Sequence, residues 1–372
     1  MRPLGIYIHV PFCLRKCAYC DFYSGPSGEA EREAYVSALV THIKDERQKW
    51  LGHTVDTVFF GGGTPSLLTP NQFHRILSAV AENGALSSEA EISLEANPAT
   101  VTLEGLKELR RAGANRISIG LQSACDEELK LLGRIHTVAD FDLTLAHCRE
   151  AGFDNVNVDL MYGIPAQTEE SFAHTLDFVT ERAPEHISAY SLILEPGTPL
   201  ARRAETLQIP DEDETADRYD LLCRTLSARG YEHYEISNFA KAGYRCRHNV
   251  KYWQREEYLG FGPSAHSFFD GCRFYYPPDR KSYCSPATRQ ILFEETDTGL
   301  TDAEEALMLA MRLSDGVDTA RFFAEYGVDF EAKYGERILP YIKGGLIRKT
   351  ERGYAFTDRG MFVSNYILAE IL

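Results

Sequence analysis

The sequence predicts an α/β protein: a partial (β/α)6 TIM-like barrel followed by a C-terminal winged-helix-like domain. Six short apolar runs typical of strands alternate with helical stretches up to residue 192. Alternating strands and helices require right-handed crossovers and therefore a parallel sheet, which curves toward a barrel at six repeats. The alternation then stops, and the last part of the chain reads as helices followed by a two-stranded hairpin.

The element ranges follow the apolar periodicity. We expect strands at residues 4–10, 55–60, 91–95, 116–120, 155–160 and 186–192. We expect helices between them at residues 30–50, 70–81, 103–112, 126–151 (as a broken stretch) and 169–180. Six strands instead of the eight of a full barrel would leave one side of the barrel open.

The segment beyond residue 192 no longer follows this repeat. It begins with a loop at 195–199, an acidic-led helix at 211–229 and a short strand at 231–236. Three further helices are expected at 303–313, 319–326 and 330–343, a hairpin at 346–349 and 354–356, and a last helix at 358–372 with Thr357 as its N-cap. We therefore expect a barrel at 1–230, a connecting region at 231–296 and a winged-helix-like domain at 297–372.

Composition excludes several classes of protein. The chain has 372 residues, of which 44% are hydrophobic and 25% charged, as in a soluble globular protein. Its net charge of -16 opposes binding to nucleic acid, because phosphate contacts need Lys and Arg. The winged-helix-like domain is also acidic, so we read it as structural or as a lid. The first 12 residues lack the order of a secretory signal, and a cytoplasmic location is expected.

Three of the nine cysteines form the decisive motif. Cys13, Cys17 and Cys20 form a Cys-x3-Cys-x2-Cys trio directly after the first expected strand. Iron–sulfur clusters normally take four thiolate ligands, so three cysteines leave one iron open to a small chelating molecule. The alternatives are a zinc site, a redox pair at Cys17 and Cys20, or three unrelated buried thiols. Arg15 and Lys16 would help to offset the negative charge of a cluster.

Two further features lie where a ligand is expected in such a fold. Residues 61–63 are three glycines at the end of the second strand, where they allow a ligand to approach the backbone or simply form a turn. Glu95, Gln122 and Asp159 stand at the C-terminal ends of later strands, the face at which barrels bind ligands. They could hold an amine and ribose hydroxyls, and Arg134 could meet a carboxylate, or each could be an ordinary strand-end polar residue.

These motifs together resemble a known family. The cysteine loop, Tyr19 before its last cysteine and the glycine-rich loop are similar to the radical S-adenosylmethionine superfamily. More closely, residues 7–13, 61–65 and 232–239 and the C-terminal wing resemble oxygen-independent coproporphyrinogen III oxidases and their relatives. This resemblance covers nearly the whole chain. It implies that Cys13, Cys17 and Cys20 bind a [4Fe-4S] cluster. It also implies that S-adenosyl-L-methionine is surrounded by Tyr7, Tyr19, Gly62, Gly63, Thr64, Glu95, Gln122, Arg134 and Asp159.

The chain departs from the oxidases at two points. They carry a further cysteine two positions after the trio, where this chain has Phe22, and they have a longer segment before the first strand. The shorter branch of the family is the haem chaperone group HemW, whose His-Asn-x2-Tyr-Trp signature is matched by residues 248–253. The resemblance therefore favours a haem chaperone over an oxidase.

His248 in this signature is the candidate haem ligand. A neutral imidazole is a normal axial ligand of haem iron, and Tyr252 and Trp253 offer flat apolar surface to a porphyrin. A histidine beside aromatic residues can equally be an ordinary packed residue, and Cys246 could also ligate iron. The cysteines outside the trio are otherwise interpreted as small buried or semi-exposed thiols.

We therefore predict a haem chaperone that binds haem, a [4Fe-4S] cluster and S-adenosyl-L-methionine, and that delivers haem to recipient proteins such as membrane cytochromes. The alternative is an oxygen-independent coproporphyrinogen III oxidase, which converts two propionates to vinyl groups. A third hypothesis is a radical enzyme with another substrate. The sequence leaves open whether the chain is an enzyme, whether it forms a homodimer and whether it makes peripheral contact with a membrane.

Overall fold

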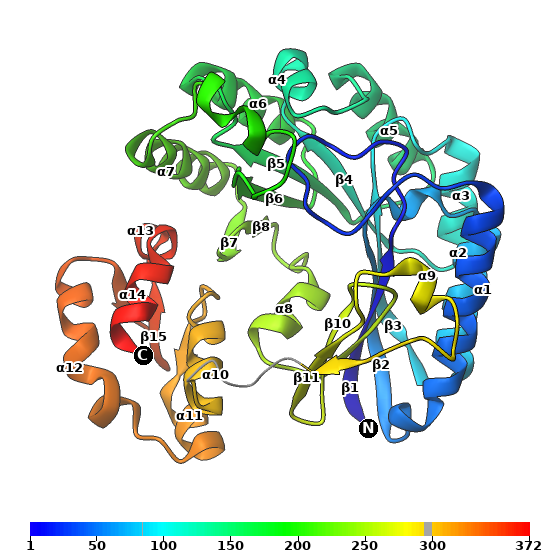
Figure 1. The fold of residues 1–372 in the computed structure, drawn as a ribbon. Coiled ribbons are helices and arrows are strands. Elements are labelled where there is room, and N and C mark those ends of the chain that lie inside the picture. The colour runs from blue at the N-terminus through cyan, green and yellow to red at the C-terminus, as the bar shows by residue number, and fades with distance from the viewer. Residues whose placement is uncertain (84, 294–299) are drawn as a thin grey trace.

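A mixed sheet of twelve strands forms the main body of the computed structural model, which describes residues 1–83, 85–293 and 300–372 (Figure 1). Its centre consists of six parallel strands in sequential order. They are β1 (Arg2–Val10), β2 (His53–Gly62), β3 (Ala85–Ala96), β4 (Arg116–Gln122), β5 (Val156–Tyr162) and β6 (His186–Ser191). The predicted α/β fold with a partial six-repeat barrel is confirmed.

Helices cover the outer face of these strands, as Figure 1 shows. They are α1 (Glu29–Asp45), α2 (Pro70–Asn83), α3 (Leu103–Arg111), α4 (Asp126–Leu131), α5 (Val138–Glu150) and α6 (Glu169–Glu181). In α2 the buried residues Phe73, Ile76, Leu77 and Val80 recur at helical spacing, which places one apolar stripe against the sheet. All seven residues of β4 are buried, including its polar members Arg116, Ser118 and Gln122.

Short strands extend the sheet at both edges. On one side β9 (Tyr258–Phe261) pairs in parallel with β1, and β10 (His266–Phe269), β11 (Cys272–Tyr275) and β12 (Leu292–Phe293) follow in antiparallel order. On the other side β8 (Asn238–Ala240) pairs with β6, and β7 (Glu232–Glu235) pairs with β8. The expected connecting region therefore supplies strands to both edges. The boundary near 231 stays a prediction, and the one near 297 lies outside the described residues.

The C-terminal part contains α10 (Asp302–Ala310), α11 (Thr319–Tyr326), α12 (Phe330–Lys343) and a three-stranded sheet of β13 (Val317–Asp318), β15 (Gly353–Phe356) and β14 (Ile347–Lys349). The predicted last helix divides into α13 (Asp358–Phe362) and α14 (Ser364–Ile371) at Val363, whose backbone leaves the helical conformation. The side chain of Thr357 accepts a hydrogen bond from the Gly360 N–H, as expected of an N-cap.

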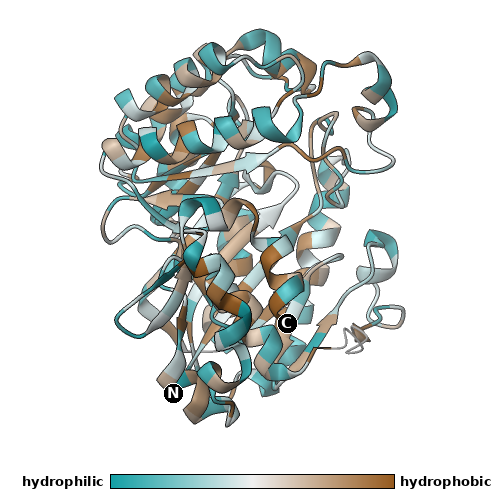
Figure 2. Cartoon of the chain, turned by 90° about the vertical axis from the view of Figure 1, so that its left-hand side faces the viewer, coloured by the Kyte–Doolittle hydropathy of each residue, from teal (hydrophilic) through white to brown (hydrophobic). Residues whose placement is uncertain are grey.

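This part of the chain lies beside α7 (Glu212–Ala228) and α8 (Arg247–Trp253) and away from α1 (Figure 1). Glu305 accepts hydrogen bonds from Arg255 and Arg273, which connects α10 to the edge of the large sheet. Along the helices, hydrophilic and hydrophobic segments alternate (Figure 2). In the part of the chain that the structure describes, no helix combines the length and the apolar character needed to cross a membrane.

Candidate iron–sulfur and cofactor site

The three cysteines lie in an irregular loop between β1 and α1. Backbone hydrogen bonds tie this loop to other parts of the chain. The Cys13 N–H donates to the Gly25 carbonyl at 3.0 Å, and the Ala18 N–H donates to the Leu132 carbonyl at 2.9 Å. The Ala18 carbonyl in turn accepts from the Leu200 N–H at 2.8 Å. The loop is therefore held by segments that follow β4 and β6.

Polar side chains donate hydrogen bonds to two of the three sulfurs. Thr64 Oγ1 lies 3.4 Å from Cys13 Sγ, and Arg134 Nη1 lies 3.4 Å from Cys17 Sγ. Such donors, above all a charged guanidinium, stabilise thiolates. Burial raises the pKa of Cys20 to about 11, and the neighbouring Cys17 adds to this rise. A bound cationic centre would offset this cost, so the donor set suits metal ligation.

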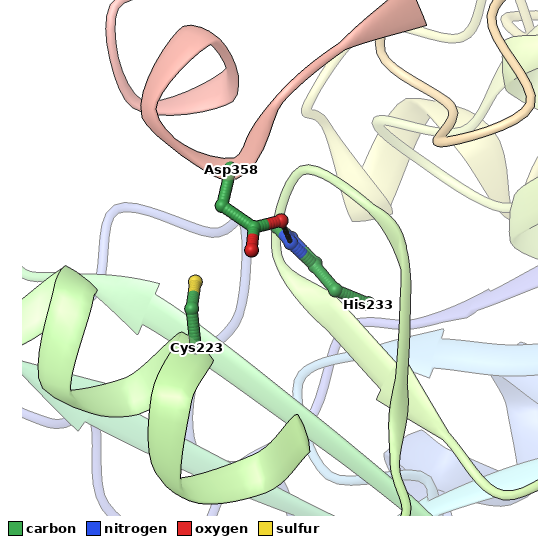
Figure 3. A group of neighbouring side chains, drawn as sticks. All are labelled: Cys223, His233 and Asp358. Atoms are coloured by element: carbon green, nitrogen blue, oxygen red, sulfur yellow. Dashed lines mark hydrogen bonds and ion pairs between the residues drawn. The ribbon is translucent and has the colours of Figure 1, made fainter. Parts of the chain in front are cut away.

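The spacing of the three cysteine sulfurs bears on whether they could bind a single metal ion. Among the described residues, three potential metal ligands have their donor atoms within 4.8 Å of one another only at Cys223, His233 and Asp358 (Figure 3). The sulfurs of the cysteine loop are therefore spaced more widely. A tetrahedral zinc ion with Zn–S bonds of about 2.3 Å holds its sulfurs only about 3.8 Å apart. In this conformation the three sulfurs are therefore not all close enough to bind one tetrahedral zinc ion.

The Cys223 group connects the barrel to the C-terminal domain. Its residues come from α7, β7 and α13, and His233 Nδ1 lies 2.8 Å from Asp358 Oδ1 (Figure 3). The His233 ring also stacks on Phe239 with ring centroids 4.3 Å apart. The hydrogen bond from His233 lowers the pKa of the Asp358 carboxyl. The observed arrangement is a hydrogen bond across the junction of the two domains.

The glycine-rich loop packs directly against the cysteine loop. A Cβ atom on Gly62, whose φ is +106°, would lie 2.5 Å from the His9 ring. A Cβ atom on Gly63 would lie 2.5 Å from the Phe12 carbonyl oxygen and 2.8 Å from that of Val10. Only glycine allows this approach, because real Cβ atoms do not come so close to backbone atoms. The glycine run therefore does more than form a turn: it allows close packing against the start of the cysteine loop.

A cavity of about 380 Å³ opens at the C-terminal ends of β2 to β5, as predicted for the ligand face. Its walls include almost all the predicted site residues: Cys13, Cys17, Tyr19, Cys20, Gly62, Gly63, Thr64, Glu95, Gln122, Arg134 and Asp159. Gln122 has a φ of 73°, a left-handed conformation that is rare for this residue type and typical of functional sites. Tyr7 is not on these walls and lines an adjacent cavity.

Two acidic side chains in this cavity lack a cationic partner at hydrogen-bond distance among the described contacts. Glu95 accepts a hydrogen bond from the Gly62 N–H at 3.1 Å, and Asp159 accepts from Ser118 and Asn157 at 3.0 and 2.7 Å. Burial raises the pKa of both carboxyls, that of Glu95 to about 8. Ionised carboxylates here would be stabilised by a cationic ligand. The sulfonium and ammonium groups of S-adenosylmethionine have this charge.

Asn97 is a site residue that sequence reasoning missed. Its Oδ1 accepts from Arg134 Nη2 at 2.6 Å, and its Nδ2 donates to Thr64 Oγ1 at 2.9 Å. Because Arg134 and Thr64 each donate to a cysteine sulfur, Asn97 closes a polar chain between Cys17 and Cys13. Asn97 follows β3 at its C-terminal end, so the argument that singled out Glu95 could have found it.

A second cavity of about 680 Å³ adjoins the first. The two share Lys16, Phe22, Gly62 and Glu95 as wall residues. The remaining walls are rich in aromatic residues and histidines, among them Tyr7, His9, Tyr23, Tyr252, Tyr258 and His266. The chain thus offers a larger, mainly aromatic compartment next to the compartment of the cysteines.

His248 is not on the walls of either cavity. It is buried, and both ring nitrogens have partners: Nδ1 lies 2.8 Å from Thr57 Oγ1, and Nε2 lies 2.8 Å from the Tyr252 hydroxyl. Burial lowers the pKa of His248 to about 3, and the charge of Lys251 adds to this, so the ring is neutral. Haem ligation by His248 stays a prediction, which in this conformation would require breaking one of these hydrogen bonds.

Comparisons with known proteins agree with this arrangement. The chain matches the family model of the radical SAM superfamily over residues 7–179 and that of the HemN C-terminal domain over residues 298–363. It is 41% identical to heme chaperone HemW of Escherichia coli over 99% of this chain and 98% of that protein. It is 34% identical to heme chaperone HemW of Lactococcus lactis over 100% and 98% of the two chains.

A solved structure is similar over the whole chain. It is that of coproporphyrinogen III oxidase (HemN) from Escherichia coli, described as a radical SAM enzyme. The two folds superpose with a TM-score of 0.84 at 26% sequence identity, covering 100% of this chain and 90% of the oxidase chain. The barrel and the C-terminal domain therefore both have counterparts in one protein.

Gly63→Ala is expected to abolish assembly of the iron–sulfur site. The added methyl group would collide with the carbonyl oxygens of Val10, at the end of β1, and of Phe12, at the start of the cysteine loop, so the loop must move. The measurement is iron and sulfide content after anaerobic reconstitution. Gly25→Ala is the matched control, since a Cβ atom there has no neighbour within 4 Å. Equal iron content in the two variants would show that the close approach does not matter.

Glu95→Gln is expected to flatten the pH dependence of stability in the cofactor-free protein. The pKa of Glu95 is raised from 4.5 to about 8 in the folded state, so the folded protein keeps a proton that the unfolded chain releases. Stability must then fall as pH rises across this window. Urea midpoints between pH 5.5 and 8 should decline more steeply for wild type and for the exposed control Glu89→Gln than for Glu95→Gln. Parallel declines would contradict the assignment.

Proposed function

The chain belongs to the HemW family of the radical SAM superfamily, and we propose that it is a haem chaperone. It binds a [4Fe-4S] cluster and S-adenosyl-L-methionine, and it holds haem for delivery to recipient proteins. The observation that carries this proposal is the 680 Å³ aromatic cavity, which adjoins the cofactor cavity and has Tyr252 of the His-Asn-x2-Tyr-Trp signature on its wall.

The size and chemistry of this cavity support haem as its occupant. Ligand cavities for molecules of this class span about 300–1,000 Å³. The rings of Tyr7, Tyr23, Tyr252 and Tyr258 offer flat surfaces for a porphyrin. The exposed ammonium group of Lys16 lies on the same wall and could pair with a propionate. Apolar faces and a cationic group together match an amphipathic macrocycle.

The smaller cavity serves the two other cofactors in this proposal. Cys13, Cys17 and Cys20 hold the cluster, which supplies an open iron and electron-transfer chemistry when bound. Glu95 and Asp159 would attract the cationic groups of S-adenosylmethionine, and Arg134 would attract its carboxylate. Gly62 and Glu95 border both cavities, so a ligand in either cavity can contact these two residues.

An oxygen-independent coproporphyrinogen III oxidase is the second candidate, favoured by the overall similarity to HemN. A coproporphyrinogen would occupy the same larger cavity. Against this candidate, Phe22 stands where the oxidases have their additional cysteine. Its side chain is 62% exposed and lines both cavities. Anaerobic incubation of the reduced, reconstituted protein with coproporphyrinogen and S-adenosylmethionine should give no vinyl product, and its formation would overturn the chaperone proposal.

The cellular setting is a further part of the proposal. We propose that the protein acts in the cytoplasm on recipients that include membrane cytochromes. A homodimer and peripheral membrane contact are compatible with this role. We also propose that the chain divides into a barrel at 1–230, a connecting region at 231–296 and a winged-helix-like domain at 297–372. The last domain would be structural or act as a lid.

Ser24→Trp is expected to weaken haem binding about tenfold or more, because the indole would occupy the larger cavity. The measurement is a hemin titration followed by optical absorbance. Ser88→Trp is the matched control, since Ser88 is exposed in the N-terminal half of β3, at the strand end opposite the cavities. Equal affinity of the two variants would place haem elsewhere on the protein.

A further inference from the structure

We infer that the phenolate oxygen of Tyr252 is a ligand of haem iron. His248 would be a positioning residue that donates a hydrogen bond to this oxygen. The inference rests on the proposed function and names the ligand at that same site. It starts from one asymmetry in the signature: Tyr252 lines the 680 Å³ cavity, whereas His248 does not. Tyrosine is an established class of haem ligand, so the residue type is suitable.

The hydrogen bonds of His248 allow it to donate to the Tyr252 oxygen. Its ring joins Thr57 Oγ1 and the Tyr252 hydroxyl, both at 2.8 Å, and is otherwise buried between Phe59 and Tyr252. Thr57 comes from β2 and is completely buried. A threonine hydroxyl can donate to Nδ1, and the neutral imidazole then carries its hydrogen on Nε2. In this tautomer Nε2–H donates to the Tyr252 oxygen, and the hydroxyl hydrogen of Tyr252 is free to point into the cavity.

A second tyrosine–histidine pair on the wall of this cavity has a polarity that its hydrogen-bond partners determine. His9 Nε2 lies 2.9 Å from the Tyr23 carbonyl oxygen, which can only accept a hydrogen bond. The neutral His9 ring therefore carries its hydrogen on Nε2, and its Nδ1 accepts from the Tyr7 hydroxyl at 3.2 Å. Tyr7 is thus fixed as a neutral donor. Of the two pairs, only the one at Tyr252 can supply a hydrogen bond to a phenolate.

The ligation step requires no redox partner. Tyr252 would hold ferric haem through its phenol oxygen, and its proton would pass to water in the cavity. No electron would be transferred, and His248, with its hydrogen on Nε2, would stay neutral and donate to that oxygen. The Nε2–H donor lowers the energy of the phenolate in the way that outer hydrogen bonds tune metal ligands. The signature histidine then matters for haem binding without touching iron.

The main competing ligand is His266, which is exposed on the cavity wall with its ring stacked on Tyr275 at 4.9 Å. The test therefore compares hemin complexes of the full-length protein with those of Tyr252→Phe, His248→Gln and His266→Ala. Tyr275→Phe is the control, since Tyr275 is a phenol outside the wall. Resonance Raman spectra report iron–phenolate vibrations, titrations report affinity, and the thermal midpoint of each variant reports folding.

The wild-type complex should show iron–phenolate vibrations, which only Tyr252→Phe abolishes, with an affinity loss of about tenfold or more. His248→Gln, which keeps an N–H donor, should retain the vibrations at altered frequency. The inference is overturned if Tyr252→Phe binds hemin with an unchanged spectrum, or if wild type shows an imidazole-ligated spectrum that the change at His248 or His266 removes. If wild type did not bind hemin at all, both this inference and the proposed function would be overturned. If wild type bound hemin through another ligand, only this inference would fail.

Discussion

The site depends on how the cysteine loop is held against the C-terminal ends of the parallel strands. This loop has no regular structure of its own, and the end of β2 fixes it through two short backbone hydrogen bonds. The Gly63 N–H donates to the Val10 carbonyl at 2.9 Å, and the Thr64 N–H donates to the Phe12 carbonyl at 2.7 Å. The absence of side chains on the glycines permits this contact. The three cysteines and the carboxylates of the later strands line the same cavity.

Charge balance explains why cluster and cofactor are expected together. The cysteine loop brings three potential thiolates beside a cavity that also contains Glu95 and Asp159, whose pKa values are raised by burial. Arg134 is the cation that contacts a sulfur directly, and Asn97 links it to Thr64 on the opposite side. Iron and a sulfonium supply the positive charge that this arrangement needs. The adjoining aromatic cavity also has two carboxylates on its wall, the shared Glu95 and Asp21, but no cysteines.

The sequence was sufficient for the features that depend on local pattern. Apolar runs placed the six parallel strands, and the strand-end rule placed Glu95, Gln122 and Asp159 on one cavity. Of the edge strands only β7 was predicted, as a strand at 231–236; β8 to β12 were missed because they have at most four residues, too few to show a period. The environment of His248 could not be foreseen, because its partner Thr57 lies 191 residues away in the chain. Which nitrogens of a histidine ring have hydrogen-bond partners depends on the assembled fold.

The central claim is that three cysteines hold a four-iron cluster and leave one iron for an exogenous chelator. Mössbauer spectroscopy of protein purified without oxygen and enriched in ⁵⁷Fe, with and without S-adenosylmethionine, tests it most directly. The account predicts a cubane signature in which one iron of the four changes its environment when S-adenosylmethionine is added. Protein that takes up zinc instead, or a cubane whose four irons ignore S-adenosylmethionine, would contradict it.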